Sequence, residues 1–359
     1  MNAQLIKEFK PMFPLKIGII CPSEIAFRRF MPSLSTLPEL YEFVGIGIAS
    51  PKEWFGESNV TSSQINEQQE RELAKAQKFS NVYGGVIFNS YEALLRNADI
   101  DAVYLPLPPA LHYKWAKLAL ENGKHVLVEK PSTTCLHDTN GLISLAKRNN
   151  LALHENYMFV FHKQIAAIHD IIHDGESIGI PYLYRITFGF PRRPANDFRY
   201  NKALGGGALL DAGGYTLKLA TVLLGEDARL TTANVNYNDD FEVEIFGTAT
   251  VVGNDGIVAQ LAFGMDNDYR CDIEVWGTKG TLTSNRILTA PAGFVPKYTL
   301  KQNQEYRDYQ LPEDDAFAES LKHFALCIKD ENTRCLNYNT IQLQASFVHQ
   351  FKQLSGMIL

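Results

Sequence analysis

The chain has 359 residues, 45% of them hydrophobic and 21% charged, and its formal net charge is −6. This length and composition predict a globular protein of two domains, each large enough to bury its own core. The negative charge and the lack of a basic block argue against nucleic acid as the main partner. The five cysteines have no metal-ligand spacing, which argues against a structural metal site and favours a reducing compartment.

The first part of the chain alternates between strand-like and helix-like patterns. Strands are expected at Leu15–Ile20, Glu42–Ala49, Ala102–Leu105, His125–Val128 and Ala152–His154. Helices are expected between them at Glu24–Thr36, Gln64–Lys78, Tyr91–Asn97, His112–Asn122 and 137–149. This alternation predicts an α/β fold with a Rossmann-type, doubly wound parallel sheet, which we assign to residues 1–132.

After about residue 180 strand-like segments follow one another, separated by turn sequences. They are Tyr182–Gly189, Arg229–Tyr237, Glu242–Val251, Val258–Phe263, Cys271–Trp276 and Gly280–Thr283. No long helix interrupts them from residue 229 onward, so they predict an open, mainly antiparallel sheet. We assign it to an α+β domain at 133–359, whose last helices, at 316–329 and 339–355, could pack back on the first domain.

Membrane and targeting signals are absent from the sequence. The first thirteen residues carry three charged side chains and no apolar segment like that of a signal peptide. No run approaches the roughly 20 apolar residues that a membrane helix needs. We therefore expect a soluble, cytoplasmic protein without a membrane partner.

The turn after the first strand normally carries glycines that let a dinucleotide pyrophosphate approach a helix N-terminus. In this chain Cys21 and Ser23 stand where those glycines would fall. Neither side chain adopts a positive φ freely, and Pro22 removes an amide donor. From this loop alone, dinucleotide binding and an ordinary strand-to-helix turn both stay open.

The second strand ends at Ala49 and is followed by Ser50-Pro51-Lys52. A cofactor with a free ribose 2′-hydroxyl usually meets an acid at this point, whereas a serine and a lysine suit a 2′-phosphate better. Ser50 and Lys52 therefore favour NADP(H) over NAD(H). The alternative is that Lys52 is only a solvated surface lysine.

Dense prolines follow the strand that ends at Leu105 and force an extended path across the carboxyl edge of the sheet. Leu107, Pro108 and His112 thereby become candidate cofactor contacts. For His112, a structural hydrogen bond at a helix start is the alternative.

Two segments carry acid–base chemistry. Glu129 and Lys130 follow the apolar strand at 126–128, where open α/β sheets bind ligands, although a charged strand end is common in any protein. Asp211 and Tyr215 lie four residues apart after a glycine run and would share one helix face. A nearby ammonium group lowers the pKa of a phenol from about 10, so Lys130 would make Tyr215 a usable proton donor. The alternative is a core tyrosine with a satisfied hydroxyl.

From about Lys16 to Leu354, the chain resembles the glucose–fructose oxidoreductase / inositol dehydrogenase (Gfo/Idh/MocA) family. The resemblance is carried by Glu129-Lys130-Pro131 after 123–128, by 205–213 and by 276–281. In that family the lysine and the aspartate lie at the hydride-transfer site, and histidine or tyrosine follows the aspartate by four residues. The resemblance implies an NAD(P)-dependent oxidoreductase with Lys130, Asp211 and Tyr215 as its catalytic residues.

Segments 24–29, 155–159 and 197–200 further resemble the sugar-nucleotide 3-ketoreductases of deoxysugar pathways. In such enzymes NADPH reduces a keto group on a nucleoside-diphosphate-linked hexose. The resemblance implies that Tyr215 or Lys130 protonates the nascent alkoxide, and that Asp211 orients Lys130 or a sugar hydroxyl.

The resemblance also implies two sets of contacts. The cofactor set is Cys21, Ser23, Glu24, Ile25, Ser50, Lys52, Leu107, Pro108, His112, Glu129 and Lys130. The substrate set is Lys130, Arg199, Tyr200, Asp211 and Tyr215, with Arg28 a further candidate for a diphosphate contact.

Two alternatives stay open. One is a dehydrogenase of a free sugar, a cyclitol or a dihydrodiol; the other is a non-catalytic sugar-nucleotide-binding protein with a degraded cofactor loop. No metal is expected. The resemblance and the open sheet predict a homodimer or homotetramer, because a second subunit would cover the exposed sheet face.

Overall fold

The computed structural model describes residues 14–357, which divide into two compact units. Within this range, the first unit comprises 14–132 together with His137–Asn156 and Ser320–Asn339, and the second comprises Thr133–Leu136, Tyr157–Glu319 and 340–357. The stretch assigned to one C-terminal domain therefore contributes two segments to the first unit. Across 14–357, no helix has the length and apolar character to cross a membrane. The segment 1–13, in which no signal peptide was expected, lies outside the described residues.

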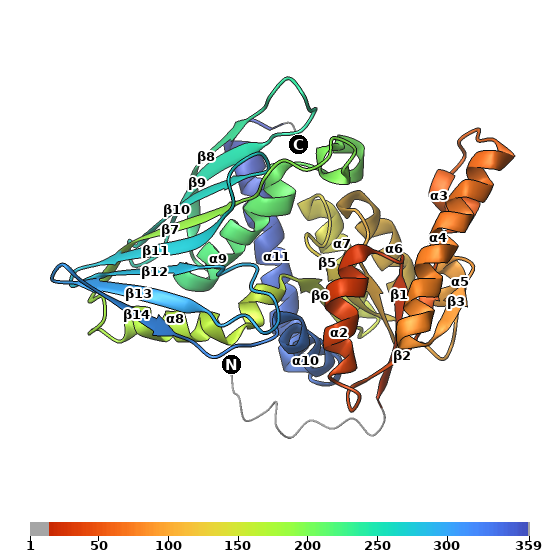
Figure 1. Cartoon of the computed structure of the whole chain (residues 1–359), viewed down its shortest axis with the longest axis horizontal. Coiled ribbons are helices and arrows are strands. Elements are labelled where there is room, and N and C mark those ends of the chain that lie inside the picture. Colours follow the sequence, from red (N-terminus) through yellow and green to blue (C-terminus); the bar gives the residue numbers. More distant parts are fainter. Residues whose placement is uncertain (1–13, 358–359) are drawn as a thin grey trace. The chain divides into compact units, whose positions relative to one another are not determined.

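The first unit is built on a six-stranded sheet in which every neighbouring pair is parallel, in the order β3-β2-β1-β4-β5-β6 (Figure 1). Its strands are β1 Leu15–Ile20, β2 Tyr41–Gly47, β3 Val86–Phe88, β4 Ala102–Leu105, β5 His125–Glu129 and β6 Leu153–Asn156. Its helices are α2 Met31–Ser35, α3 Pro51–Phe55, α4 Ser62–Tyr83, α5 Tyr91–Leu95, α6 Pro109–Glu121 and α7 Leu136–Arg148. The predicted Rossmann-type sheet is confirmed.

Local sequence explains several of these elements. The central strands β4 and β5 are apolar and buried on both faces, as parallel strands between helices must be. Helix α4 begins with a capping box, in which Thr61 and Gln64 each bond the other's backbone amide. Helix α6 begins with Pro109, whose missing N–H costs nothing in a first turn.

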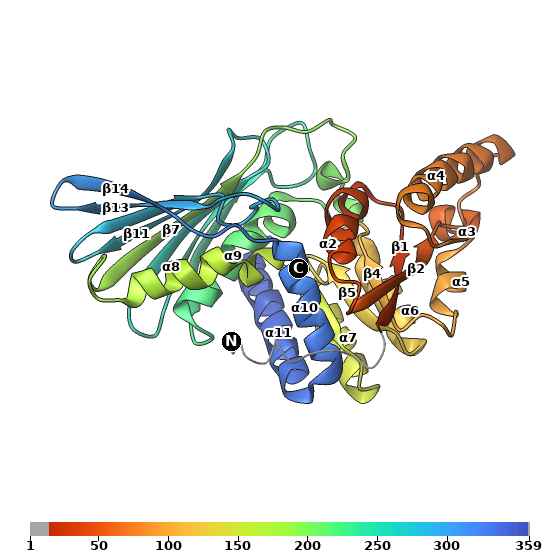
Figure 2. The same cartoon turned by 60° about the horizontal axis from the view of Figure 1, so that its bottom comes forward.

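The second unit is built on an eight-stranded sheet in the order β14-β13-β12-β11-β7-β10-β9-β8, antiparallel except between β7 and β10. Its strands are β7 Pro181–Gly189, β8 Arg229–Asn236, β9 Phe246–Val252, β10 Val258–Gly264, β11 Arg270–Gly277, β12 Thr281–Asn285, β13 Lys297–Gln302 and β14 Glu305–Gln310. Helices α8 Lys163–His173 and α9 Gly214–Leu224 cover one face of this sheet (Figure 2). Helices α10 Ala316–Lys329 and α11 Glu331–Leu354 close the chain, and each contributes residues to both units. The predicted mainly antiparallel sheet is confirmed.

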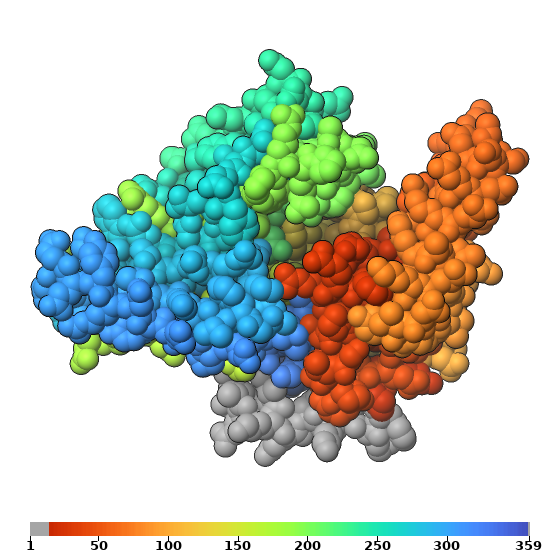
Figure 3. Space-filling view, viewed as in Figure 1, coloured from red at the N-terminus to blue at the C-terminus, as the bar shows by residue number. Residues whose placement is uncertain are grey.

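The structure also contains elements that the sequence patterns did not indicate. They are β3, α3, α8 and the hairpin of β13 and β14, which lies at the surface of the second unit (Figure 3, blue). All six residues of β14 are exposed, so this strand has no apolar alternation that could have indicated it. The strand expected at Glu242–Val251 begins only at Phe246, because the backbone carbonyl of Glu244 accepts a hydrogen bond from Ala208 N, before α9, instead of joining the sheet.

Candidate active site

Lys130 follows the last residue of β5, and its neighbours are held on both sides. On the N-terminal side, Glu129 Oε1 accepts hydrogen bonds from Tyr104 Oη at 2.6 Å and from Asn156 Nδ2 at 2.7 Å. Burial raises the pKa of Glu129, although these two bonds and the Lys130 ammonium oppose the rise. The ring of Tyr104 stacks on Phe30 with centroids 4.0 Å apart, which links Glu129 to the helix that follows β1.

On the C-terminal side, Lys130 is joined to Pro131 by a cis peptide bond, and Pro131 O lies 2.7 Å from His112 Nδ1. His112 Nε2 lies 2.7 Å from Leu107 O, so both nitrogens of the fully buried ring face backbone carbonyls, and a neutral ring donates to one of them. Burial lowers the pKa of His112 to about 4, although the two carbonyls oppose that shift. Both nitrogens are thus occupied, and the structural alternative for His112 describes it better than the predicted cofactor contact.

Ser132 provides a further anchor, because its backbone amide donates to Glu155 Oε1 at 2.7 Å. Segment 129–132 is therefore fixed by side chains from β4, α6 and β6. Of the predicted contacts nearby, Leu107 is 7% exposed and Pro108 is the residue immediately before α6. Such anchoring places Lys130 on a rigid support at the carboxyl edge of the sheet.

The turn after β1 keeps the backbone geometry of a glycine turn without the glycine. Cys21 has φ +82°, a left-handed conformation that costs a non-glycine residue about 1–2 kcal/mol. Its thiol lies near Tyr91 and Glu72, both of which are buried, so the side chain turns into the interior of the unit. Burial, followed by the negative charge of Glu72, raises the pKa of this thiol to about 12.

A helix follows this turn directly. Ser23 Oγ accepts a hydrogen bond from Ala26 N at 3.2 Å and so caps the helix start, where Glu24 and Ile25 are exposed. Its next turn, Ala26–Phe30, is π-helical and includes Arg28, which lies 3.5 Å from Glu24. A left-handed turn leading into an exposed helix N-terminus fits the pyrophosphate of a dinucleotide.

The residues after β2 have mostly local roles. Ser50 caps α3 in a capping box with Glu53, whose carboxylate also accepts bonds from the backbone amides of Tyr91 and Glu92. The Glu53 carboxylate, the acid nearest to the end of β2, therefore already accepts hydrogen bonds from backbone amides. The Lys52 side chain is 85% exposed and lies 4.0 Å from Glu57, so it is available to a phosphate group in solution.

In the second unit, the glycine run before the predicted acid and phenol is required by close packing. Gly205 adopts a left-handed conformation, and a side chain at Gly206 would meet Arg199 O at 2.4 Å. Gly207 has φ +120°, and a Cβ there would lie 2.5 Å from Glu244 Oε1. That oxygen accepts a hydrogen bond from Leu209 N at 2.9 Å, so Glu244 caps the helical segment that begins there.

Asp211 lies in this segment, within the π-helical turn Leu209–Gly213 that precedes α9. Its Oδ2 accepts a hydrogen bond from Arg199 Nε at 2.6 Å, and Arg199 Nη1 donates to Asp197 Oδ1 at 3.1 Å. Burial would lower the pKa of Arg199, but the two aspartates raise it above its usual value. π-helical turns are frequent at functional sites, and here the turn presents a carboxylate whose orientation is fixed.

Tyr215 is 7% exposed, and its ring packs against Tyr157, Phe159 and Phe188 with centroids 5.1–5.7 Å apart. The phenol is therefore held rigidly in an aromatic cluster. Tyr157 can approach α9 because the residue before Tyr215 is a glycine. A Cβ on Gly214 would lie 2.1 Å from the Tyr157 hydroxyl oxygen.

Tyr200 was expected to contact substrate, but its surroundings indicate a structural role. Its hydroxyl accepts a hydrogen bond from Arg193 N at 3.0 Å and donates to Met265 O at 3.1 Å. The ring stacks on Phe241 with centroids 3.9 Å apart and is 6% exposed. A buried ring whose hydroxyl already has a donor and an acceptor does not support the predicted contact.

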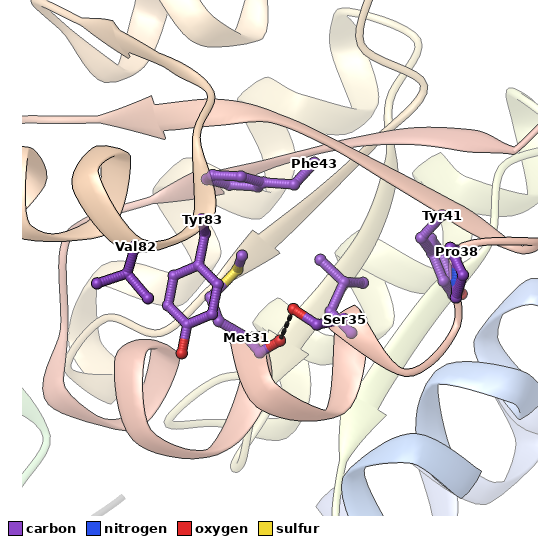
Figure 4. Close-up of a pocket in the computed structure, with 8 residues that line it drawn as sticks. Met31, Ser35, Pro38, Tyr41, Phe43, Val82 and Tyr83 are labelled. Atoms are coloured by element: carbon purple, nitrogen blue, oxygen red, sulfur yellow. Dashed lines mark hydrogen bonds between the residues drawn. The ribbon is translucent and has the colours of Figure 1, made fainter.

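A hollow of about 280 Å³ lies elsewhere in the first unit (Figure 4). Its lining residues are Met31, Leu34, Ser35, Pro38, Tyr41, Phe43, Val82 and Tyr83. Tyr41 and Phe43 lie at the amino end of β2, whereas ligands of open parallel sheets bind at the carboxyl ends. This hollow is therefore not part of the candidate active site.

Comparison with known proteins agrees with this architecture. A family model described as "Oxidoreductase family, NAD-binding Rossmann fold" matches residues 41–157, and the GFO/IDH/MocA C-terminal domain matches residues 165–283. The dTDP-3,4-didehydro-2,6-dideoxy-alpha-D-glucose 3-reductases of Actinomadura kijaniata and Streptomyces violaceoruber are each 35% identical over 88% of this chain, and the aligned regions cover 88% and 85% of theirs. A crystal structure of a 3-ketoreductase from A. kijaniata in complex with NADP and TDP-benzene has a TM-score of 0.84 at 33% identity, covering 95% of this chain and 98% of that one.

The fold and the family matches together define an NAD(P)-dependent oxidoreductase. Its Rossmann unit presents a lysine at the carboxyl edge of the sheet, and its second unit presents an aspartate and a tyrosine. With matches over both units, the chain belongs to the Gfo/Idh/MocA family of oxidoreductases.

Several site residues were not identified from sequence. Tyr104 and Asn156 anchor Glu129, Glu155 anchors Ser132, and Glu244 caps the segment that carries Asp211. Glu155 and Asn156 belong to a segment that carried the family resemblance, which was the one signal available for them. Tyr104 lies in an apolar strand and Glu244 in an apparent strand, and neither pattern indicates a polar role.

Proposed function

We propose that this protein uses NADPH to reduce a keto group on a nucleoside-diphosphate-linked deoxyhexose. The observation that carries the proposal is the 35% identity, over 88% of both chains, to a dTDP-hexose 3-reductase from A. kijaniata. Lys130, Asp211 and Tyr215 lie on supports that would hold such a reaction centre in place.

The cofactor, when bound, supplies the hydride that goes to the carbonyl carbon. The helix start at Ser23–Ile25 would hold its pyrophosphate, and Lys52 would hold a 2′-phosphate. The 85% exposure of Lys52 and the NADP in the related crystal structure support NADP(H) over NAD(H). Comparing the dissociation constants of NADPH and NADH, in wild type and in Lys52→Ala, tests this preference: only NADPH should bind more weakly to the variant.

As the carbonyl carbon gains the hydride, the C=O π-electrons pass to oxygen, and the alkoxide takes a proton from Tyr215 or Lys130. The donor then regains its proton from solvent. Asp211 is held by Arg199, and in this mechanism it orients Lys130 or a sugar hydroxyl. The Lys130 ammonium also stabilises the developing negative charge on oxygen.

Loss of absorbance at 340 nm is the direct test of the reaction. Purified protein with NADPH and a dTDP-linked keto-deoxyhexose should show turnover, while free sugars, cyclitols and dihydrodiols should not. Turnover of a free polyol with NADP⁺, and none of the nucleotide sugar, would replace this proposal with the free-sugar alternative.

The non-catalytic alternative depended on the altered loop at Cys21. A backbone that already has φ +82° supports a loop that still accepts the cofactor. The Cys21→Gly variant should therefore bind NADPH with a dissociation constant within about threefold of wild type. A gain of a hundredfold or more would instead indicate a loop that has lost its affinity.

We infer that the protein acts as a homodimer or homotetramer in the cytoplasm. The uncovered sheet face carries Tyr182, 61% exposed, and Trp276, 42% exposed and stacked under Arg185 at 4.5 Å. Much of the remaining face is polar, as in the pair Thr187–Asp272, so a subunit contact there would be mixed rather than apolar. Light scattering should give two or four chain masses, and Trp276→Glu should lower that number.

A further inference from the structure

A buried chain of polar side chains runs from Glu129 to the C-terminal helices, entirely within the first unit. Asn156 Nδ2 donates to Glu129 at 2.7 Å, and Asn156 Oδ1 accepts from Ser320 Oγ at 2.9 Å. Ser320 Oγ lies 3.0 Å from His154 Nε2, and His154 Nδ1 lies 3.2 Å from Asn337 Oδ1. Asn156 is fully buried, and Ser320 and His154 are 1% exposed, so solvent water cannot compete for these hydrogen bonds.

The amide groups at either end set the direction of this chain. Asn337 Nδ2 donates to Leu153 O at 2.7 Å, so Asn337 Oδ1 is an acceptor and His154 Nδ1 carries the proton. In the neutral His154 ring, Nε2 is then a hydrogen-bond acceptor, and Asn156 Oδ1 is also an acceptor. The single hydroxyl proton of Ser320 is therefore shared between Asn156 and His154, which makes Ser320 the link that joins the two halves.

We propose that Ser320 and His154 are positioning residues for Lys130, acting through Asn156 and Glu129. Tyr104 and Asn156 both donate to Glu129 Oε1, and Asn156 presents its Nδ2 to Glu129 because Ser320 holds its other end. Without Ser320 the amide can rotate, one of the two bonds to Glu129 weakens, and the support beside Lys130 becomes looser. A mispositioned catalytic group lowers kcat more than it raises KM.

A metal site is an alternative interpretation of the part of this cluster around His154. The ligand atoms of His154, His323 and Cys327 lie within 4.8 Å of one another. Both nitrogens of His154 are, however, engaged by Ser320 and Asn337, so an ion would have to displace one of these partners. The hydrogen-bonded chain therefore describes His154 better.

The test compares Ser320→Ala with Ser284→Ala, a control of similar burial. Ser284 is 5% exposed, belongs to the second unit and donates to Lys297 O at 2.8 Å. Both variants should lose a similar amount of stability. Only S320A should lower kcat, by about tenfold with substrate KM nearly unchanged, as expected for one buried hydrogen bond. S320T keeps the hydroxyl and should recover most of the loss. His154→Phe leaves Ser320 donating to Asn156, so it should lower kcat less than S320A does.

The inference rests on the proposed role of Lys130, so a second readout does not depend on turnover. The dissociation constant of NADPH is measured for S320A, E129A and the double variant. Coupling through Asn156 predicts that S320A weakens NADPH binding by about threefold alone and has no further effect in E129A. Additive effects, or an S320A variant that differs from wild type only in stability, would overturn the inference. Stoichiometric Zn²⁺ binding that disappears in H154F would do so too, whereas full turnover by Lys130→Ala would refute the proposed function and leave the binding cycle valid.

Discussion

Replacing Gly207 by alanine tests whether the glycine run exists to let Glu244 cap the segment that carries Asp211. Two effects oppose an alanine there. The backbone has φ +120°, and a left-handed conformation costs a residue with a Cβ about 1–2 kcal/mol. The new Cβ would also lie 2.5 Å from Glu244 Oε1, and the buried carboxylate can move away only by releasing Leu209 N.

The loss of that charge-assisted hydrogen bond adds about 1.5–3 kcal/mol. We therefore expect Gly207→Ala to lower the free energy of unfolding by about 2.5–5 kcal/mol. Gly225, at the C-terminal end of α9, provides the matched control. Its φ is +83° and its ψ 175°, and a Cβ there would have no neighbour within 4 Å, so Gly225→Ala should cost only the backbone strain of about 1–3 kcal/mol.

Urea unfolding followed by near-ultraviolet circular dichroism measures both losses. A double-variant cycle separates the two effects, because in a Glu244→Ala background the contact is gone and Gly207→Ala should cost no more than strain. Two results would refute this account of the glycine run. One is an equal loss of unfolding free energy in Gly207→Ala and Gly225→Ala. The other is a Gly207→Ala loss that is as large in the Glu244→Ala background as in wild type.

Three further outcomes are expected. Lys130→Ala and Tyr215→Phe should each lower kcat by about 10²–10⁴-fold with little change in the urea midpoint, and unchanged rates in both would remove them from the catalytic set. Burial lowers the pKa of His323 to about 4 against 6.5 unfolded, so below pH 6.5 the unfolded chain binds the proton first. His112 and His125 have similarly lowered pKa values, so each of these three histidines should lower stability by about 1.4 kcal/mol per pH unit down to pH 4, and His323→Gln should reduce the total slope by that amount; equal acid sensitivity of variant and wild type would contradict this. Alkylation near pH 7.5, read by mass spectrometry, should modify the exposed Cys135 and Cys335 well before Cys21, whose thiol has a pKa of about 12; early labelling of Cys21 would show an accessible thiolate.

The sequence predicted those parts of the molecule that local patterns encode. The apolar run before Glu129 marked β5, and the strand–helix alternation around it marked the parallel sheet. The exposed strand β14 has no alternation, and its pairing with β13 follows from a turn at positions 303–304, which have positive φ without glycine. The local pattern therefore contains no signal for this hairpin.

The sequence proposed residues for the candidate site but not the partners that hold them. Lys130, Asp211 and Tyr215 were found by motif, yet the partners that hold them come from distant positions: Asn156 beside Glu129, and Arg199 beside Asp211. The spacing of Asp211 and Tyr215 suggested an ordinary α-helical face, whereas Asp211 lies in a π-helical turn whose geometry no residue type signals.

Backbone strain was the least predictable feature. The side chain at position 21 suggested that the loop avoids a positive φ, and the structure has φ +82° there. Hydrogen bonds and packing around a turn can hold a non-glycine residue in that region. The backbone amide of Cys21 donates to Gly47 O at 3.1 Å and its thiol lies near Tyr91, and both of these partners lie outside the loop.

The interleaving of the two units along the chain bears on how the protein can be made. The Rossmann unit takes β6 from beyond residue 132 and a helical segment, Ser320–Asn339, from near the end of the chain. During synthesis its first 132 residues leave the ribosome long before Ser320 and Asn337, the partners of His154, exist. Strand β6 completes the sheet once residue 156 has been synthesised, but His154 then lacks Ser320 and Asn337 until the C-terminal helices emerge. A fragment that ends at residue 132 would keep an exposed sheet edge permanently and should aggregate, even though it contains the whole cofactor loop.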